Sequence, residues 1–139
     1  MSTQTRTEPA RWFSGRACLI ALQRHADARG TLMPLDFDAL PFAPGRCFTV
    51  SDAPAGTVRG GHAHRRGQQL LICVQGRIDV DMRHGDDRAR AVLEPNGSGL
   101  LIGPLVWATQ RYLLPDSVLL VLASDPFDPT SYVEDAAHR

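Results

Sequence analysis

Short β-prone runs recur along this chain and are separated by glycine, proline, asparagine and aspartate. From residue 17 onward they include ACLIALQ, GTLMPL, RCFTVSD, QQLLICVQ, RIDVDMR, RARAVLE, SGLLIG, LVWATQRYL and SVLLVLAS. The 12 glycines and 10 prolines supply many tight connections, and no stretch supports a helix of three turns. This rhythm predicts an all-β fold, a sandwich or barrel of short strands.

Two hairpins are predicted in the middle of the chain. The first joins QQLLICV to RIDVDMR across residues 75–76, and apolar and polar residues alternate over 78–83 as a half-buried strand requires. The second turns within HGDDR, where Gly85 is the residue best able to adopt a positive φ.

The length of 139 residues fits one domain with its own core. Residues 1–15 are polar and show no period, so we expect an N-terminal arm there, anchored by Trp12 and Phe13. Residues 16–139 are expected to form the single domain.

Charge and cysteine usage narrow the classes of partner. The 15 basic and 15 acidic side chains cancel, which argues against nucleic acid or an anionic membrane surface as a partner. Three widely spaced cysteines in apolar stretches predict a reduced, cytoplasmic protein. No apolar run is long enough to span a membrane, and the first residues do not read as a signal peptide.

The chemistry concentrates in the segment GTVRGGHAHRRGQQLLICVQG, which contains His62 and His64. Residues two apart on a strand point to the same face, so both imidazoles can enter one cavity. The spacing from Gly56 through this pair to Gln69 and Gly76 resembles the first signature of the cupin superfamily, which implies an RmlC-like double-stranded β-helix jelly roll. The alternative is a pair of surface histidines near a glycine-rich turn.

A metal site is not expected, and neither is a cofactor. The position at which cupins place a glutamate ligand holds Gln69, a weaker donor, and the GPLVWATQ segment offers no third imidazole. Two neutral histidines can instead move protons, because imidazole titrates near pH ~6.5.

Several blocks together resemble the sugar-nucleotide 3,4-ketoisomerases, which are metal-free cupins. The blocks are ARGTL, LPF, RCFTV, VRGGHAH, QQLLICVQG, GLLIGPLVW, SVLLVLAS and the following SYV. The resemblance implies a dTDP-linked 4-keto-6-deoxyhexose as substrate and a shift of the keto group from C4 to C3 through an enediol. His64 is expected to act as the base and His62 as its partner.

The resemblance also implies binding residues. Arg59 and Arg46 match family arginines, whose guanidinium groups suit a pyrophosphate or a sugar oxygen. Gln69 is expected to bind a sugar hydroxyl or to orient a histidine. Trp107 is expected to line the pocket or to pack in the core, and Arg29 to contact the nucleotide or to be an exposed turn residue.

The chain departs from the family pattern after Arg46. Family members show two adjacent tyrosines where this chain has Phe48 and Thr49, and a histidine where it has Ala108. Two alternatives therefore stay open beside the isomerase: a nucleotide-sugar-binding cupin with altered catalysis, and a metal-dependent cupin enzyme. A homodimer is expected, because a partner subunit can cover an exposed sheet edge.

Overall fold

The computed structural model describes residues 10–95 and 97–133, and nearly all of its regular structure is β. One sheet has six strands in the order β1 (Arg11–Trp12), β2 (Ala17–Ala21), β10 (Ser98–Ile102), β7 (Gln69–Gln75), β12 (Val118–Ala123) and β5 (Arg46–Val50). The other has five, in the order β13 (Tyr132–Val133), β6 (Thr57–His64), β11 (Trp107–Tyr112), β8 (Ile78–His84) and β9 (Asp87–Leu93). The all-β prediction is confirmed.

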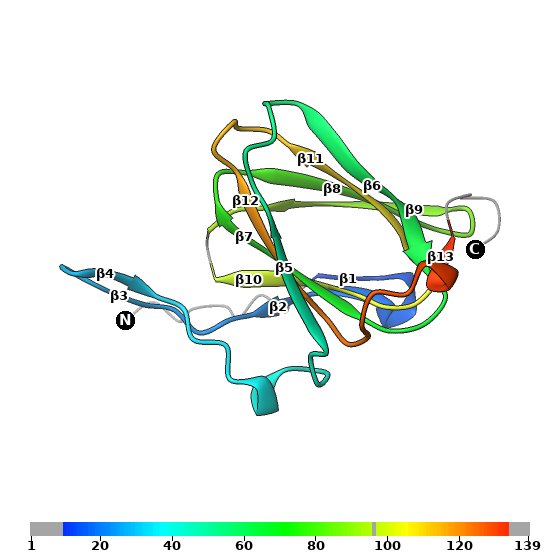
Figure 1. The fold of residues 1–139 in the computed structure, drawn as a ribbon, viewed down its shortest axis with the longest axis horizontal. Coiled ribbons are helices and arrows are strands. Elements are labelled where there is room, and N and C mark those ends of the chain that lie inside the picture. The colour runs from blue at the N-terminus through cyan, green and yellow to red at the C-terminus, as the bar shows by residue number, and fades with distance from the viewer. Residues whose placement is uncertain (1–9, 96, 134–139) are drawn as a thin grey trace, which may run out of the picture.

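The two large sheets face each other, and a separate hairpin extends away from them (Figure 1). This hairpin consists of β3 (His25–Asp27) and β4 (Gly30–Leu32), and all of the residues in these two strands are exposed. The helical elements of the described part are three short 3-10 turns: η1 (Phe13–Gly15), η2 (Phe37–Ala39) and η3 (Pro129–Ser131). No helix within residues 10–95 and 97–133 has the length and apolar character that crossing a membrane requires.

The middle of the six-stranded sheet is buried on both faces, which explains the continuous apolar runs of its central strands. In β7, Leu71 and Cys73 join the core between the sheets, whereas Leu70 and Ile72 point outward under the segment 33–42. A strand covered on both faces does not alternate with polar residues, unlike β8, where only one face is fully apolar. The segment 33–42 thus covers part of the outer face of this sheet.

The predicted hairpin between β7 and β8 is wrong. The two strands belong to different sheets: β7 pairs with β10 and β12, and β8 pairs with β9 and β11. The chain passes from one sheet to the other at Gly76, which has a φ of 84° and packs directly against Ser117. The Ser117 hydroxyl also accepts the N–H of Arg77 at 3.2 Å and so fixes the direction in which the chain leaves the first sheet.

The second predicted hairpin is confirmed, since β8 and β9 pair from Ile78↔Leu93 to His84↔Asp87 and Gly85 has a φ of 61°. Residues 1–9 of the predicted N-terminal arm lie outside the described residues. Arg11–Trp12 forms a short strand against β2, and Trp12 and Phe13 pack on the core. The boundary between arm and domain stays a prediction.

Candidate active site

A cavity of about 280 Å³ lies between the two large sheets. Strands of both sheets line it with polar side chains, including Arg46, Arg59, His62, Gln69 and Gln110. Its volume is near the lower end of the range for small-molecule sites, roughly 300–1,000 Å³. Four of the residues singled out from the sequence therefore meet in one place.

His64 lies next to this cavity, not in its wall. It lines a smaller cleft of about 20 Å³, and the two openings share Arg46, Gln69 and Tyr132 as lining residues. Both imidazoles lie on the same face of β6, where the cavity and the cleft adjoin, and the expectation that they share one chamber stays a prediction.

The two histidine rings are close, and a tyrosine contacts both. The His62 and His64 ring centroids are 5.2 Å apart, with an interplanar angle of 82°. The ring of Tyr132 lies 4.5 Å from His62 and 4.6 Å from His64. Tyr132 was not among the predicted site residues, although it belongs to the SYV block at the end of the family resemblance.

A β-bulge in β6 places Arg59 and His62 on the same side. Residues three apart on a regular strand face opposite ways, yet His62 pairs with Ala108 and Arg59 pairs with Gln110, and these two partners are two residues apart. The extra residue is Gly61, and both Gly60 and Gly61 adopt positive φ values, 86° and 84°. Because opposite residues of an antiparallel pair share a face, the bulge brings the guanidinium and the imidazole to the same cavity.

The edge strand β5 supplies the opposite wall. Its alternate residues Arg46, Phe48 and Val50 are the less exposed ones and line the cavity. The Arg46 guanidinium lies 4.6 Å from the Phe48 ring centroid and 5.2 Å from that of Phe127. Of the two positions that hold tyrosine in the family pattern, Phe48 is thus the one whose ring faces inward, and it carries no hydroxyl.

Two buried polar atoms around the site lack a hydrogen-bond partner in the described part of the chain, His64 Nε2 and the Tyr112 hydroxyl. Burial, followed by the neighbouring His62 and Arg46, lowers the pKa of His64 to about 4, against the opposing influence of Asp125. The ring is therefore neutral at pH 7, and none of the described residues forms a hydrogen bond with its Nε2. Such a nitrogen is available to a ligand or to a proton.

Acidification is expected to destabilise the fold through His64. Its pKa is 6.5 as a free group and about 4 in the folded protein, so the unfolded chain binds more protons between these values. The free energy of unfolding should therefore fall as the pH falls from 6.5 towards 4. Urea unfolding of the wild type and of His64→Asn at pH 7 and near pH 4 measures how far the free energy of unfolding falls. His64→Asn is expected to make this fall smaller by about 1–2 kcal/mol, a value reduced because solvent screens a half-buried ring. Equal losses in both proteins would contradict this assignment.

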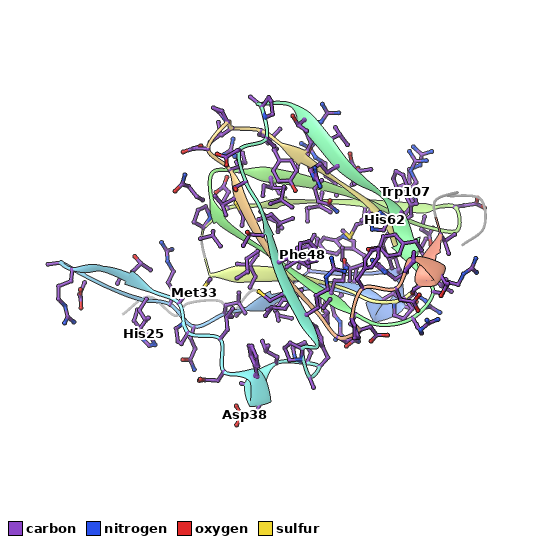
Figure 2. The ribbon with its side chains drawn as sticks, in the orientation of Figure 1. His25, Met33, Asp38, Phe48, His62 and Trp107 are labelled. Carbon is purple, nitrogen blue, oxygen red and sulfur yellow. The ribbon has the colours of Figure 1, made fainter. Side chains whose placement is uncertain are left out.

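Trp107 and Arg29 lie outside both spaces. The Trp107 ring packs 5.1 Å from the Arg83 guanidinium and near Gly61, so it supports the bulge from the side. Arg29 forms an exposed ion pair with Asp27, at 2.7 Å, on the projecting hairpin. Figure 2 shows His25 of the same hairpin well away from His62. The ligand contacts predicted for Trp107 and Arg29 stay predictions.

The donor set that the described residues bring to the site does not include three metal-ligating side chains. Within the described residues, no group of three or more histidine, cysteine, aspartate or glutamate side chains is arranged to hold a metal ion. Gln69 lines the cavity beside His62, and its neutral amide is a weaker ligand than the glutamate of the cupin signature.

Comparisons with known proteins find 3,4-ketoisomerases that are similar to this chain. A TDP-4-oxo-6-deoxy-alpha-D-glucose-3,4-oxoisomerase of Aneurinibacillus thermoaerophilus is 32% identical over 116 residues, which cover 83% of this chain and 84% of that protein. A mutant of the 3,4-ketoisomerase QdtA from Thermoanaerobacterium thermosaccharolyticum, solved with TDP-4-keto-6-deoxyglucose, is 31% identical and superposes with a TM-score of 0.83 over 86% of this chain and 88% of the other.

The fold is shared more widely. The rmlC epimerase of Mycobacterium tuberculosis is only 14% identical, yet it superposes with a TM-score of 0.76 over 91% of this chain and 72% of the epimerase. The predicted RmlC-like cupin jelly roll is thereby confirmed. The family model described as FdtA: WxcM-like, C-terminal matches residues 16–138, and the chain belongs to that family.

Proposed function

We propose that this protein is a 3,4-ketoisomerase that converts a TDP-linked 4-keto-6-deoxyhexose into its 3-keto isomer during deoxysugar biosynthesis. The observation that carries the proposal is the pair His62 and His64, with ring centroids 5.2 Å apart, beside a cavity whose wall holds Arg46 and Arg59. The oxoisomerase relative is named for a sugar of this class, and the QdtA mutant was solved with one.

The reaction needs a base for a carbon-bound proton and positive charge near the enediolate oxygens. We assign the base to His64, because its Nε2 has no protein partner among the described residues and its pKa of about 4 keeps it neutral. His62 lines the larger cavity and contacts the same tyrosine, so it is assigned as the partner that holds or shares the proton.

The two arginines are assigned to the anionic parts of the ligand. Arg46 lies where the cavity and the cleft adjoin, close to the histidines, and suits the hexose oxygens or the phosphate next to them. Arg59 lines the cavity and is also exposed to solvent. This position suits a diphosphate that extends from the cavity towards solvent. Gln69 reaches both spaces and is assigned to a sugar hydroxyl or to orienting an imidazole.

We also propose a cytoplasmic homodimer. Cys18, Cys47 and Cys73 are all free thiols, which suits a reducing compartment. The hairpin β3–β4 is exposed throughout, Leu32 to 64%, and an isolated two-stranded sheet is marginally stable in water, so a second copy is the favoured cover. The contact predicted for Arg29 requires such a copy, since this hairpin lies away from the cavity of its own chain.

The direct test is isomerisation in deuterated water. The purified protein is incubated with TDP-4-keto-6-deoxyglucose, and the products are followed by NMR. The expected result is the 3-keto isomer carrying deuterium at C4. An unchanged substrate, tested also with the C4-keto sugars of other configurations, would reject the isomerase.

The same experiment separates the remaining candidates. Phe48 lines the cavity at a position where the family pattern has tyrosine, so the cavity wall lacks that hydroxyl. This difference favours a binding protein with altered catalysis as the second candidate. That candidate predicts stabilisation by TDP without any product. A metal-dependent enzyme predicts stoichiometric metal in elemental analysis of the active protein.

A further inference from the structure

The proposed isomerisation moves protons on oxygen as well as on carbon. The substrate has a carbonyl at C4 and a hydroxyl at C3, and the product has them exchanged. A base that takes the C3 proton and returns one to C4 leaves the hydroxyl proton of O3 to be moved to O4. Given the proposed function, a group near the hexose has to perform this second transfer.

Tyr132 is the side chain that packs against both imidazoles. Its ring lies 4.5 Å from that of His62 and 4.6 Å from that of His64, and it lines both the cavity and the cleft. A ligand that reaches His62 from the cavity therefore meets the same tyrosine that packs on His64.

The backbone around Tyr132 is firmly attached to β6. Tyr132 pairs directly with His64, and Val133 pairs with Ala63. The preceding turn is also fixed, because the N–H of Arg65 donates to the carbonyl of Ser131 at 2.6 Å. The backbone of Tyr132 is thus held beside the histidines by the pairing of β13 with β6.

Apart from Thr49, at an exposed position of β5, the other hydroxyls of the cavity and the cleft are engaged in hydrogen bonds or lie farther along the strands from the histidines. The Ser124 hydroxyl of the cleft donates to Asp125 at 2.8 Å and accepts the N–H of Gln68 at 2.8 Å. Tyr112 lines the cavity, but it pairs with Thr57, at the opposite end of the β6–β11 pairing from His62, and Phe48 has no hydroxyl. This leaves the phenol of Tyr132 as the favoured hydroxyl for work on the hexose.

We propose that Tyr132 is a catalytic residue that relays the proton from O3 to O4 of the hexose. His64 first takes the proton from C3, and the electron pair of that bond forms the C3–C4 double bond while the C4 carbonyl becomes an enolate oxygen. Tyr132 then gives its hydroxyl proton to O4 and receives the proton of O3. Finally, the C3–O bond becomes the carbonyl, the double-bond electrons take a proton from the histidine at C4, and both protein groups return to their starting states.

The test is Tyr132→Phe, which keeps the ring contacts with both histidines and removes only the hydroxyl. Without the relay the enolate still forms but returns to substrate by taking a proton at C3. In deuterated water the variant should therefore form the isomer roughly 100-fold more slowly while recovered substrate still gains deuterium at C3. Binding of TDP, which has no hexose, is expected to be unchanged.

The ratio of deuterium exchange at C3 to isomer formed decides the outcome. A purely structural tyrosine would lower exchange and isomerisation together or neither, and either result would overturn the relay. Tyr132→Leu provides the comparison, because it also removes the ring packing and should lower both rates. If the wild-type protein binds TDP but forms no isomer, the proposed function fails. If the wild type is active and Tyr132→Phe isomerises as fast, only the relay fails.

Discussion

Replacement of His64 by asparagine is expected to slow isomerisation by about 10²–10⁴-fold, the usual contribution of a general base. Asparagine occupies a similar volume and can still form hydrogen bonds, but it cannot accept a proton at neutral pH. Deuterium exchange at C3 should fall by the same factor, because His64 is assigned to the carbon-bound proton. The measurement is NMR in deuterated water, with exchange and isomer followed in the same sample.

A matched histidine elsewhere provides the control. His84 lies outside both spaces, with its Nδ1 3.1 Å from the Leu105 carbonyl oxygen and its ring 6.0 Å from that of Phe13. His84→Asn makes the same chemical change and should leave the rate close to that of the wild type below its melting temperature. If the His64→Asn protein kept its activity, His64 could not be the base. The rate of His62→Asn would then show whether His62 is the base.

The order of strands could be predicted only in part from the sequence. Period-2 alternation is local, so the strand at 78–84 and the turn at Gly85 were identified correctly. The choice of partner strand is not local: β7 and β8 are adjacent in the chain and have the length of a hairpin, yet burial of β7 on both faces places it inside the other sheet. A continuous apolar run was the available sign that β7 would not pair as a half-exposed hairpin strand.

The histidine pair was predictable for the same reason, since residues two apart on a strand share a face whatever the fold. Tyr132 was not, because it reaches the histidines only through the pairing of β13 with β6. Arg59 was identified by resemblance alone; simple alternation would have placed it opposite His62. The consecutive glycines at 60 and 61 were the signal for the bulge that reverses this expectation.

Because of that bulge, Gly60→Ala is expected both to destabilise the protein and to impair the site. A Cβ at Gly60 would lie 2.9 Å from the Ala108 carbonyl oxygen and 2.8 Å from Gln110 Oε1, at a φ of 86°. The left-handed conformation costs about 1–2 kcal/mol for a residue with a Cβ, and relief of the backbone contact adds about 1–3 kcal/mol. The melting temperature should fall by roughly 5–15 °C.

Gly61→Ala separates strain from contact, because it has nearly the same φ, 84°, and its nearest neighbour is Trp107 at 3.9 Å. It should lose only the conformational part, about 1–2 kcal/mol. The Gly60 variant must also displace Gln110 or shift β6 against β11, and either movement disturbs the face that Arg59 and His62 share. Its affinity for TDP and its isomerisation rate, measured well below its melting temperature, should therefore fall further than those of the Gly61 variant. Equal stability and equal affinity in the two variants would mean that the bulge does not set the geometry of the cavity.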